Sequence, residues 1–368
     1  MIPDQSQAVN GEGMADQAQA PVMEVRDLHR HFLIGATLIN RVTGRRPQVL
    51  RAVDGVSFDI VRGEVLGLVG ESGSGKTTLG RCMLRLTEPS SGQIRFEGDD
   101  ILSLEGAQLR PFRRQAQIIF QNPYASLNPR MKVGQMLAEV LLVHRMCSQD
   151  EVGDRVRELL HMVGLPPKVA QRYPSMFSGG QRQRISIARA LALRPKFLVA
   201  DEPVSSLDVS VQAQILNLLL GLKRELGFTM MFIAHDLGVI RYIADRVAVM
   251  YLGRIVELAP AHELFEEPWH PYTRALLRSV PCISTRHLTA VEEIPGDPPS
   301  PLDLPTGCRF STRCSIARQH CTIEEPALLT SVGAGRAVAC WAWQAGWDET
   351  ADRPPVMSTG TNDTIVGT

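Results

Sequence analysis

The segment Gly70–Thr77, which reads Gly-Glu-Ser-Gly-Ser-Gly-Lys-Thr, constrains the fold of this chain more than any other part. It fits the pattern G-x-x-x-x-G-K-[ST], follows the apolar run Glu64–Val69 and precedes a helix-like stretch. In this context successive backbone N–H groups curl around an anion, and the helix dipole adds to the attraction. The sequence therefore predicts a phosphate-binding loop, with Lys76 reaching phosphate oxygens and the Thr77 hydroxyl holding Mg²⁺. A flexible glycine turn is the alternative.

Two further apolar runs, Phe197–Ala200 and Thr229–Ala234, have the length of buried strands. Between them apolar residues recur close to the helical period, at Val211, Ile215, Leu218, Leu219 and Leu222. Strands that alternate with helices indicate a parallel sheet covered by helices, so we expect an α/β fold.

Two adjacent carboxylates, Asp201 and Glu202, follow the first of these runs. Ligands of open α/β sheets bind at the carboxyl ends of the strands. Asp201 is therefore a candidate for holding Mg²⁺ through its water shell, and Glu202 for orienting or deprotonating an attacking water. Without the upstream loop, a solvated turn would be a serious alternative.

A second glycine pair lies in Phe177–Arg184, which reads FSGGQRQR and opens a predicted helix. Ser178 is placed to cap this helix, and Gly179-Gly180 allow a close backbone approach, which together would make a second anion site. Taken alone, the motif is only a helix cap with turn glycines.

The rest of the chain divides into regions of different pattern. Short strands are expected at Val22–Val25 and Val56–Phe58, with a loop or insertion from Ile34 to Gly55, and an edge hairpin at Gly92–Gly98. Helices are expected at Val133–Leu142 and Val152–Leu160, within a helical subdomain at about 125–192. We predict disordered tails at 1–21 and 348–368, a main domain at 22–265 and an appended module at 266–347.

Composition excludes several classes of protein. The chain has 39 lysine and arginine residues and 39 aspartate and glutamate residues. It therefore lacks the excess of basic residues that would indicate a nucleic-acid partner. No stretch approaches the roughly 20 apolar residues that cross a bilayer, and the polar N-terminus lacks the features of a secretory signal. A cytosolic location is expected, where cysteines stay reduced or bind metal.

Four of the seven cysteines, Cys308, Cys314, Cys321 and Cys340, form the pattern C-x5-C-x6-C-x18-C. Zinc ribbons usually carry C-x2-C pairs, whereas ligand spacing for a [4Fe-4S] cluster varies more widely. Zinc remains an alternative, with His320 able to replace one cysteine, and so do four reduced thiols. The other three cysteines are expected to be ordinary thiols.

The motifs together resemble the nucleotide-binding subunit of ATP-binding cassette (ABC) transporters. They are a Walker A loop, SGGQ, a Walker B strand ending in Asp201-Glu202, the segment Ser205–Asp208, and His235. The resemblance implies a P-loop ABC ATPase core with an antiparallel β subdomain and an α-helical subdomain. It also implies ATP and Mg²⁺ as ligands and hydrolysis of ATP.

Residue roles follow from the resemblance where this sequence matches the family's motifs. Gln121 is similar to the Q-loop glutamine that touches Mg²⁺ or the lytic water, and His235 to the switch histidine at the γ-phosphate. Phe32 stands where the family stacks an aromatic ring on adenine, although tyrosine is usual there. Asp208 belongs to the D-loop.

The resemblance implies three sets of site residues. The nucleotide-binding set is Phe32, Gly70, Ser72, Gly73, Ser74, Gly75, Lys76, Thr77 and Thr78, and the catalytic set is Glu202, His235, Gln121 and Lys76. Thr77, Gln121 and Asp201 would hold Mg²⁺. In this family Ser178, Gly179, Gly180 and Gln181 close over the ATP of a second cassette, so the chain alone would be half an ATPase.

Other segments resemble the ATPases of oligopeptide and dipeptide importers. These are PWHPYTRALLRSVP from Pro268, IPGDPPSPLDLPTGCRF from Ile294, and QNPYASLNPR from Gln121. The likeness implies a second, non-identical ATPase subunit, two permease subunits, an extracytoplasmic binding protein, and a location on the cytoplasmic face of the inner membrane. It also favours a [4Fe-4S] cluster on the four cysteines. The cargo stays open between peptides, nickel complexes and glutathione.

A soluble ABC ATPase of translation or DNA repair is the main rival. Translation factors of this superfamily carry two cassettes on one chain, and repair ATPases insert a long coiled coil before the signature. This chain shows one motif set and no such coiled coil. The sequence therefore favours a transporter subunit.

Overall fold

The structure is a computed structural model that describes residues 20–35, 47–279, 283–284, 287–288, 296–330 and 335–344. The predicted tails lie outside the described residues except for Ala20 and Pro21. Cys282 and residues 36–46 of the segment expected to be a loop or insertion also lie outside them.

A central sheet of eight strands has the order β13-β14-β10-β9-β3-β8-β7-β6. The strands are β3 (Val65–Val69), β6 (Ala116–Ile119), β7 (Phe197–Asp201), β8 (Thr229–Ile233), β9 (Arg246–Tyr251), β10 (Arg254–Pro260), β13 (Leu329–Thr330) and β14 (Ala337–Val338). Strands β6, β7, β8, β3 and β9 run parallel. Beyond β9 each further pair is antiparallel: β10 with β9, β14 with β10, and β13 with β14. The predicted parallel α/β core is therefore confirmed.

The parallel strands are buried on both faces because each face carries its own core. In β8, Met230 and Phe232 belong to one core, and Met231 and Ile233 belong to the other. This division follows from the alternation of side chains along a strand. It explains why these strands are continuously apolar in the sequence.

Helices cover both faces of the central sheet. They include α2 (Lys76–Met83), α7 (Gly179–Leu191), α8 (Val209–Leu226) and α9 (Leu237–Ile243). The buried positions of α8 are Ile215, Leu216, Leu219 and Leu222, close to the predicted apolar face, and the helix ends at Gly227 in a left-handed conformation. Within the described residues no helix is both long enough and apolar enough to cross a bilayer.

A second, antiparallel sheet has the order β2-β1-β4-β5. Its strands are β1 (Pro21–Ile34), β2 (Gln48–Val61), β4 (Ser91–Phe96) and β5 (Asp99–Asp100). The hairpin expected at Gly92–Gly98 is present at the edge of this sheet, as β4 and β5.

The loop expected from Ile34 to Gly55 is wrong at both of its ends, because Ile34 is the last residue of β1 and Gln48–Gly55 lies in β2, which pairs with β1 from Ile34↔Gln48 onward. Polar and apolar residues are mixed in this stretch, so its sequence pattern does not predict a strand. Long-range pairing to β1 creates it, and that pairing cannot be read from local pattern.

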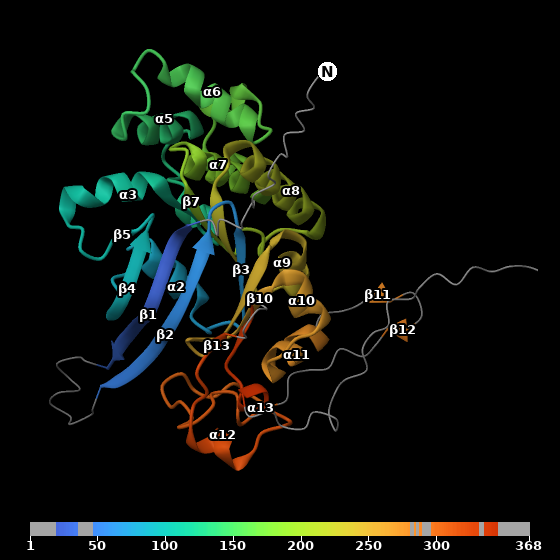
Figure 1. Ribbon diagram of the computed structural model, residues 1–368. Helices are drawn as coiled ribbons and strands as arrows, with labels where there is room; N and C mark the ends of the chain where they lie inside the picture. The colour runs from blue at the N-terminus through green and yellow to red at the C-terminus, as the bar shows by residue number, and fades with distance from the viewer. Residues whose placement is uncertain are drawn as a thin grey trace, which may run out of the picture.

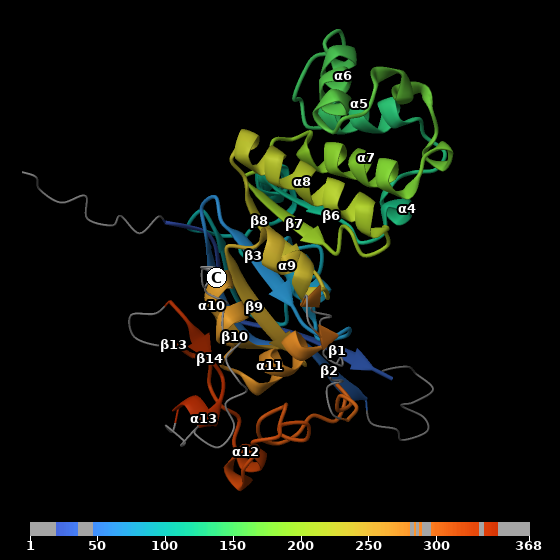
Figure 2. The ribbon, with the colours of Figure 1, turned by 90° about the vertical axis from the view of Figure 1, so that its right-hand side faces the viewer.

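A helical region lies at one end of the molecule, drawn in green in Figures 1 and 2. The segments that lead into it and form it are η1 (Gly106–Gln108), α3 (Leu109–Gln115), α4 (Pro123–Ser126), α5 (Val133–Val143), α6 (Val152–Met162), η2 (Pro167–Gln171) and η3 (Pro174–Met176). The helices predicted at Val133–Leu142 and Val152–Leu160 are confirmed as α5 and α6.

The last part of the C-terminal region, with α12 (Gln319–Ile323) and α13 (Trp341–Gln344), lies at the opposite end of the molecule from the helical region (Figures 1 and 2). The elements of the C-terminal region are α10 (Ala261–Glu266), α11 (Pro271–Arg278), β11 (Ile283–Ser284), β12 (His287–Leu288), α12 and α13, besides β13 and β14. Because β14 pairs with β10, this region extends the central sheet and does not stand apart from it.

Candidate active site

The phosphate-binding loop lies between β3 and α2, and two of its glycines cannot be replaced without collision. Gly70 has φ +152°, and a Cβ there would lie 2.0 Å from the carbonyl oxygen of Met250. Gly75 has φ +106°, and a Cβ there would lie 2.0 Å from the carbonyl oxygen of Ala52. The loop is therefore held tightly between β9 and β2, and only glycine fits at these two positions.

Lys76 is buried beneath this loop at the first turn of α2. Its Nζ donates to the carbonyl oxygens of Gly70 at 2.8 Å and of Glu71 at 2.9 Å. Burial lowers the pKa of Lys76, although the carboxylates of Glu202 and Asp201 act in the opposite direction. The ammonium group is thus aimed into the loop that the motif predicts to cradle phosphate.

Thr77 and Asp201 meet across the sheet edge, where Thr77 Oγ1 donates to Asp201 Oδ1 at 2.9 Å. Asp201 is 1 % exposed, and burial raises its pKa. A hydroxyl and a carboxylate are the oxygen donors that Mg²⁺ prefers, and a cation here would compensate the buried carboxylate. The two residues therefore fit the predicted Mg²⁺ role.

Glu202 is the centre of a second set of contacts. Gln121 Nε2 donates to Glu202 Oε2 at 2.7 Å, and His235 Nδ1 lies 3.5 Å from the same oxygen. The backbone of Glu202 has φ +44°, a conformation that residues other than glycine rarely adopt. The N–H of Glu202 donates to the carbonyl oxygen of Ile233 at 3.0 Å. Such strain in the backbone persists where the surrounding structure enforces it, often at functional sites. The structure thus brings together three of the predicted catalytic residues.

The SGGQ segment begins α7, with Ser178 as the predicted cap. Ser178 Oγ accepts from the N–H of Gln181 at 3.4 Å, and the Gln181 side chain accepts from the N–H of Ser178 at 3.2 Å. A Cβ on Gly180 would lie 2.5 Å from Cγ1 of Val211 in α8. Asp208 caps α8, accepting from the N–H of Val211 at 3.0 Å. The SGGQ segment and the start of α8, which Asp208 of the D-loop caps, therefore pack against each other.

Phe32 lies on β1 and is half-buried, with the guanidinium of Arg30 4.3 Å from the centre of its ring. The neighbouring strand β2 approaches the phosphate-binding loop at Ala52. The adenine-stacking role of Phe32 remains a prediction.

The four clustered cysteines line one cavity, together with His270, Ser311 and Trp341. Burial raises the pKa of the Cys308 thiol to about 12 and that of Cys314 to about 11. No three of the four sulfurs lie within 4.8 Å of one another. His320 does not line this cavity; its ring packs edge-on against Trp341. The structure thus gathers the four cysteines and leaves the histidine outside.

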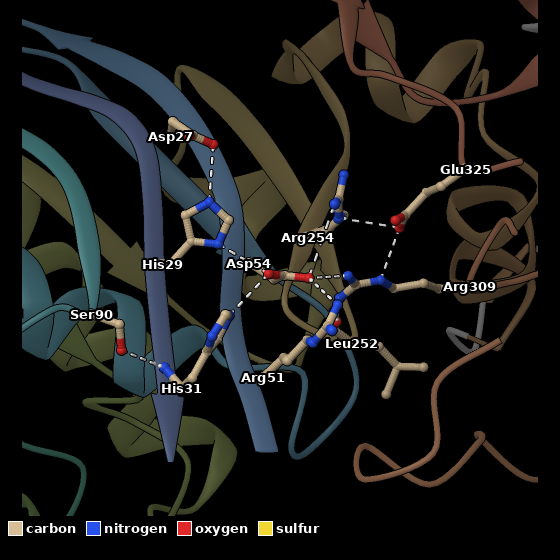
Figure 3. A network of polar contacts seen from close by, with 10 residues as sticks. All are labelled: Asp27, His29, His31, Arg51, Asp54, Ser90, Leu252, Arg254, Arg309 and Glu325. Atoms are coloured by element: carbon tan, nitrogen blue, oxygen red, sulfur yellow. Dashed lines mark hydrogen bonds and ion pairs between the residues drawn. The ribbon is translucent and has the colours of Figure 1, made fainter. Parts of the chain in front are cut away.

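A further polar cluster that the sequence did not reveal surrounds Asp54 on β2 (Figure 3). Its Oδ1 lies 3.0 Å from both His29 Nδ1 and His31 Nε2, and its Oδ2 accepts from Arg309. The ligand atoms of His29, His31 and Asp54 are close enough for a metal ion. However, Arg51, Arg254 and Arg309 all carry positive charge within 4.0 Å of the carboxylate, which disfavours a cation.

The sequence patterns also did not predict contacts between the C-terminal region and the phosphate-binding loop. Arg313 pairs with Glu71, and Tyr272 accepts from the N–H of Glu71 at 2.8 Å. Glu71 is an unspecified position of the loop motif and Arg313 lies next to a cysteine, so no local pattern links them.

The fold and the arrangement of these motifs define an ABC ATPase. Residues 53–205 match the model of the ABC transporter family, and residues 256–321 match that of the oligopeptide/dipeptide transporter C-terminal region. The chain belongs to the family of ABC transporter ATP-binding proteins that carry this C-terminal region.

Relatives match along most of their length. The oligopeptide transport ATP-binding protein AppF of Bacillus subtilis is 50 % identical over 84 % of this chain and 93 % of its own. The di/tripeptide transport ATP-binding protein DppF of Pseudomonas aeruginosa is 47 % identical over 83 % of this chain and 94 % of its own. A solved dimer of an ATP-binding cassette bound to ADP and phosphate is 27 % identical, with a TM-score of 0.57 over 65 % of this chain and 98 % of its own.

Proposed function

We propose that this chain is the ATP-hydrolysing subunit of an importer that takes up dipeptides or oligopeptides across the cytoplasmic membrane. The observation that carries the proposal is the presence, in one chain, of the ABC site and of the oligopeptide/dipeptide C-terminal region. Relatives named for oligopeptide and di/tripeptide transport match this whole arrangement, not only the ATPase core.

Hydrolysis of ATP is assigned to the residues around Glu202. The Glu202 carboxylate accepts a proton from the attacking water, whose oxygen forms the new bond to the γ-phosphorus as the bond to the β,γ-bridging oxygen breaks. ADP and phosphate are the products. Lys76 binds the β- and γ-phosphate oxygens, and His235 contacts the γ-phosphate. Gln121 Nε2 donates to Glu202 Oε2 at 2.7 Å and so helps to hold the carboxylate in place.

Thr77, Asp201 and Gln121 would hold Mg²⁺, which neutralises phosphate charge when bound. The chain's contribution is to orient these oxygen donors, because Thr77 and Asp201 are already hydrogen-bonded to each other.

The complete ATP site is assigned to two cassettes that meet head to tail. Ser178 and Gln181 are exposed at the start of α7, where they are available to an ATP molecule bound by another subunit. A cassette of the same fold has been solved as a dimer. We assign the second cassette to a non-identical subunit.

The remaining partners are two permease subunits and an extracytoplasmic binding protein, and the chain would lie on the cytoplasmic face of the inner membrane. The domain limits that accompany this proposal are 22–265 for the cassette, with its helical subdomain at about 125–192, and 266–347 for the C-terminal module.

We assign a [4Fe-4S] cluster to Cys308, Cys314, Cys321 and Cys340. Tetrahedral zinc, with Zn–S distances of about 2.3 Å, would hold its thiolates less than about 4 Å apart. Among any three of the four sulfurs, at least one pair lies more than 4.8 Å apart, which is wider than that arrangement requires. Burial and mutual repulsion raise the pKa of Cys308, so a bound positive centre is needed to keep the thiolates ionised. The cluster would stabilise a region that is poor in regular structure.

Anaerobic purification tests the cluster. We expect brown protein with about four iron and four sulfide per chain, and loss of colour in Cys314→Ser. Cys147→Ser, which removes a thiol outside the cavity, is the matched control and should keep the iron. Colourless protein with stoichiometric zinc would replace the assignment.

Co-purification from membranes of the native host, with this chain as bait, tests the transport function. We expect two permeases, a second ATPase and a binding protein. Uptake of a labelled peptide should be restored to cells lacking the chain by the parent but not by Lys76→Ala. Uptake of nickel complexes or glutathione in place of peptides would change the cargo. Recovery of ribosomes or DNA-repair proteins without permeases would overturn transport.

A further inference from the structure

Glu71, within the phosphate-binding loop, is held by the C-terminal region of the same chain. Arg313 Nη1 donates to Glu71 Oε2 at 2.9 Å and Arg313 Nη2 donates to Glu71 Oε1 at 3.0 Å. Two parallel bonds of this kind fix both the direction and the distance of a carboxylate. The Arg313 side chain is only 4 % exposed, so solvent screens the pair weakly.

The backbone of Glu71 is held from the same side. Its N–H donates at 2.8 Å to the hydroxyl of Tyr272, which lies in α11. The Tyr272 ring packs against Tyr251 of β9 and against Phe310, with ring centres 4.6 Å and 5.3 Å away. The hydroxyl therefore sits on a rigid aromatic cluster that joins the central sheet to the C-terminal region.

The contact bears directly on Lys76, because Lys76 donates to the carbonyl oxygen of Glu71 at 2.9 Å. The Glu71 carboxylate is also close enough to Lys76 to raise the pKa of the ammonium group. An unpaired carboxylate at this position would repel the phosphates of ATP. Arg313 neutralises that charge and binds both oxygens of the carboxylate from the C-terminal region.

We propose that Arg313 is a positioning residue of the ATP site, which acts through Glu71 and makes the C-terminal region part of the nucleotide-binding machinery. Arg313 immediately precedes Cys314, so the folding of the cysteine-bearing segment places its guanidinium. The proposal rests on the assignment of Gly70–Thr78 as the ATP site.

Arg309 provides a matched control for Arg313. It lies beside Cys308, its side chain is 5 % exposed, and it joins the C-terminal region to the core through Asp54 (Figure 3). It bonds the carbonyl oxygen of Leu252 and the carboxylate of Glu325, both outside the phosphate-binding loop. Loss of Arg309 should loosen the same interface without exposing Glu71.

Titration of the full-length protein with a fluorescent, non-hydrolysable ATP analogue and Mg²⁺ tests the proposal. Arg313→Ala should raise the Kd about tenfold, the effect of losing charge-assisted hydrogen bonds at a binding loop. Arg309→Ala should lower the melting temperature while keeping the Kd within about twofold of the parent. A parental Kd in Arg313→Ala, or an equal rise in Arg309→Ala, would overturn the proposal.

The double variant Arg313→Ala/Glu71→Ala separates charge from general damage. It should bind the analogue more tightly than Arg313→Ala alone, because the unpaired carboxylate is gone. Binding that is weaker than in either single variant would contradict the mechanism.

Two further variants cover other outcomes. If Arg313→Ala fails to fold, Arg313→Lys keeps the charge but loses the paired bonds, and a smaller rise in Kd is expected; a parental Kd would overturn the role. Lys76→Ala must abolish binding. Retention of binding there would instead show that the ATP site itself is wrongly assigned.

Discussion

The side-chain amide of Gln121 donates to the carboxylate of Glu202 at 2.7 Å, so the loop after β6 is tied to the carboxylate at the end of β7. These strands are adjacent in the central sheet, and Gln121 lies only two residues beyond the end of β6. Movement of the segment at Gln121 would therefore shift Glu202 directly. The contact gives the nucleotide site a physical connection to the helical region that begins just after this loop.

Glu202→Gln should abolish ATP turnover while preserving ATP binding. Glutamine keeps the shape and the contact with Gln121 but cannot accept the proton, so we expect kcat to fall by at least about 100-fold. The Kd for ATP should stay within about twofold. Phosphate release and analogue binding check the two quantities, and turnover at the parental rate would rule out Glu202 as the base.

Thr77→Ala should weaken the response to Mg²⁺, because it removes both the hydroxyl that we propose as a metal ligand and its 2.9 Å bond to Asp201. The Mg²⁺ concentration at half-maximal ATPase activity should rise about 10- to 100-fold. Thr77→Ser keeps the hydroxyl and is the matched control. Equal Mg²⁺ responses in the two variants would contradict the role of the hydroxyl.

Gly180→Ala should lower both stability and activity. The added Cβ would lie 2.5 Å from Cγ1 of Val211, and overpacking of this kind costs about 1–2 kcal/mol. Val211→Ala in the same chain should restore most of the lost stability by removing the colliding methyl groups. Gly221→Ala, where no atom lies within 4 Å of the added Cβ, should be neutral or stabilising. Thermal unfolding measures the stability of the three variants, and phosphate release measures their ATPase activity.

Asp54→Asn should destabilise the protein at neutral pH by about 2–3 kcal/mol, because the buried guanidinium of Arg309 would lose one of its two carboxylate partners and keep only Glu325. Asp27→Asn is the control: Asp27 bonds the other nitrogen of His29, but its side chain is 80 % exposed, and less than about 0.5 kcal/mol is expected. Denaturant unfolding at pH 7 measures the two changes.

The cost of Asp54→Asn should depend on pH. Burial alone would raise the pKa of Asp54, but hydrogen bonds from Arg309, His31 and His29 outweigh burial and hold the pKa well below its usual 3.8. The ionised Asp54 therefore stabilises the folded state fully at pH values above 3.8, the pKa of its carboxyl in the unfolded chain. This stabilisation is lost progressively as the pH falls from 3.8 toward the lower pKa of the folded state. The difference between parent and variant should shrink on acidification below that pH, and a difference that grows would contradict the ion pair.

Local pattern was sufficient for the central part of this protein. The loop Gly70–Thr77, the strand ending at Asp201 and the helix caps at Ser178 and Asp208 are each specified by residues close together in the sequence. Gly70 and Gly75 occupy fixed positions of that motif and have positive φ, although the carbonyls that exclude a Cβ there belong to β9 and β2. Continuous apolar runs indicate strands buried on both faces. The α/β fold could therefore be predicted from pattern, whereas the roles of Gln121 and His235 beside Glu202 followed from the resemblance to ABC transporter ATPases.

Tertiary structure alone decided the rest, because the contacts join residues that lie far apart in the chain. Strand β2 forms over Gln48–Gly55 only through pairing with β1, and the burial of Asp54 depends on Arg309, 255 residues further along the chain. Glu71 and Arg313 are separated by 242 residues, and neither has a periodic or spaced pattern that marks its partner. Their pairing depends on how the C-terminal region extends the sheet through β14, a packing outcome that sequence order does not contain.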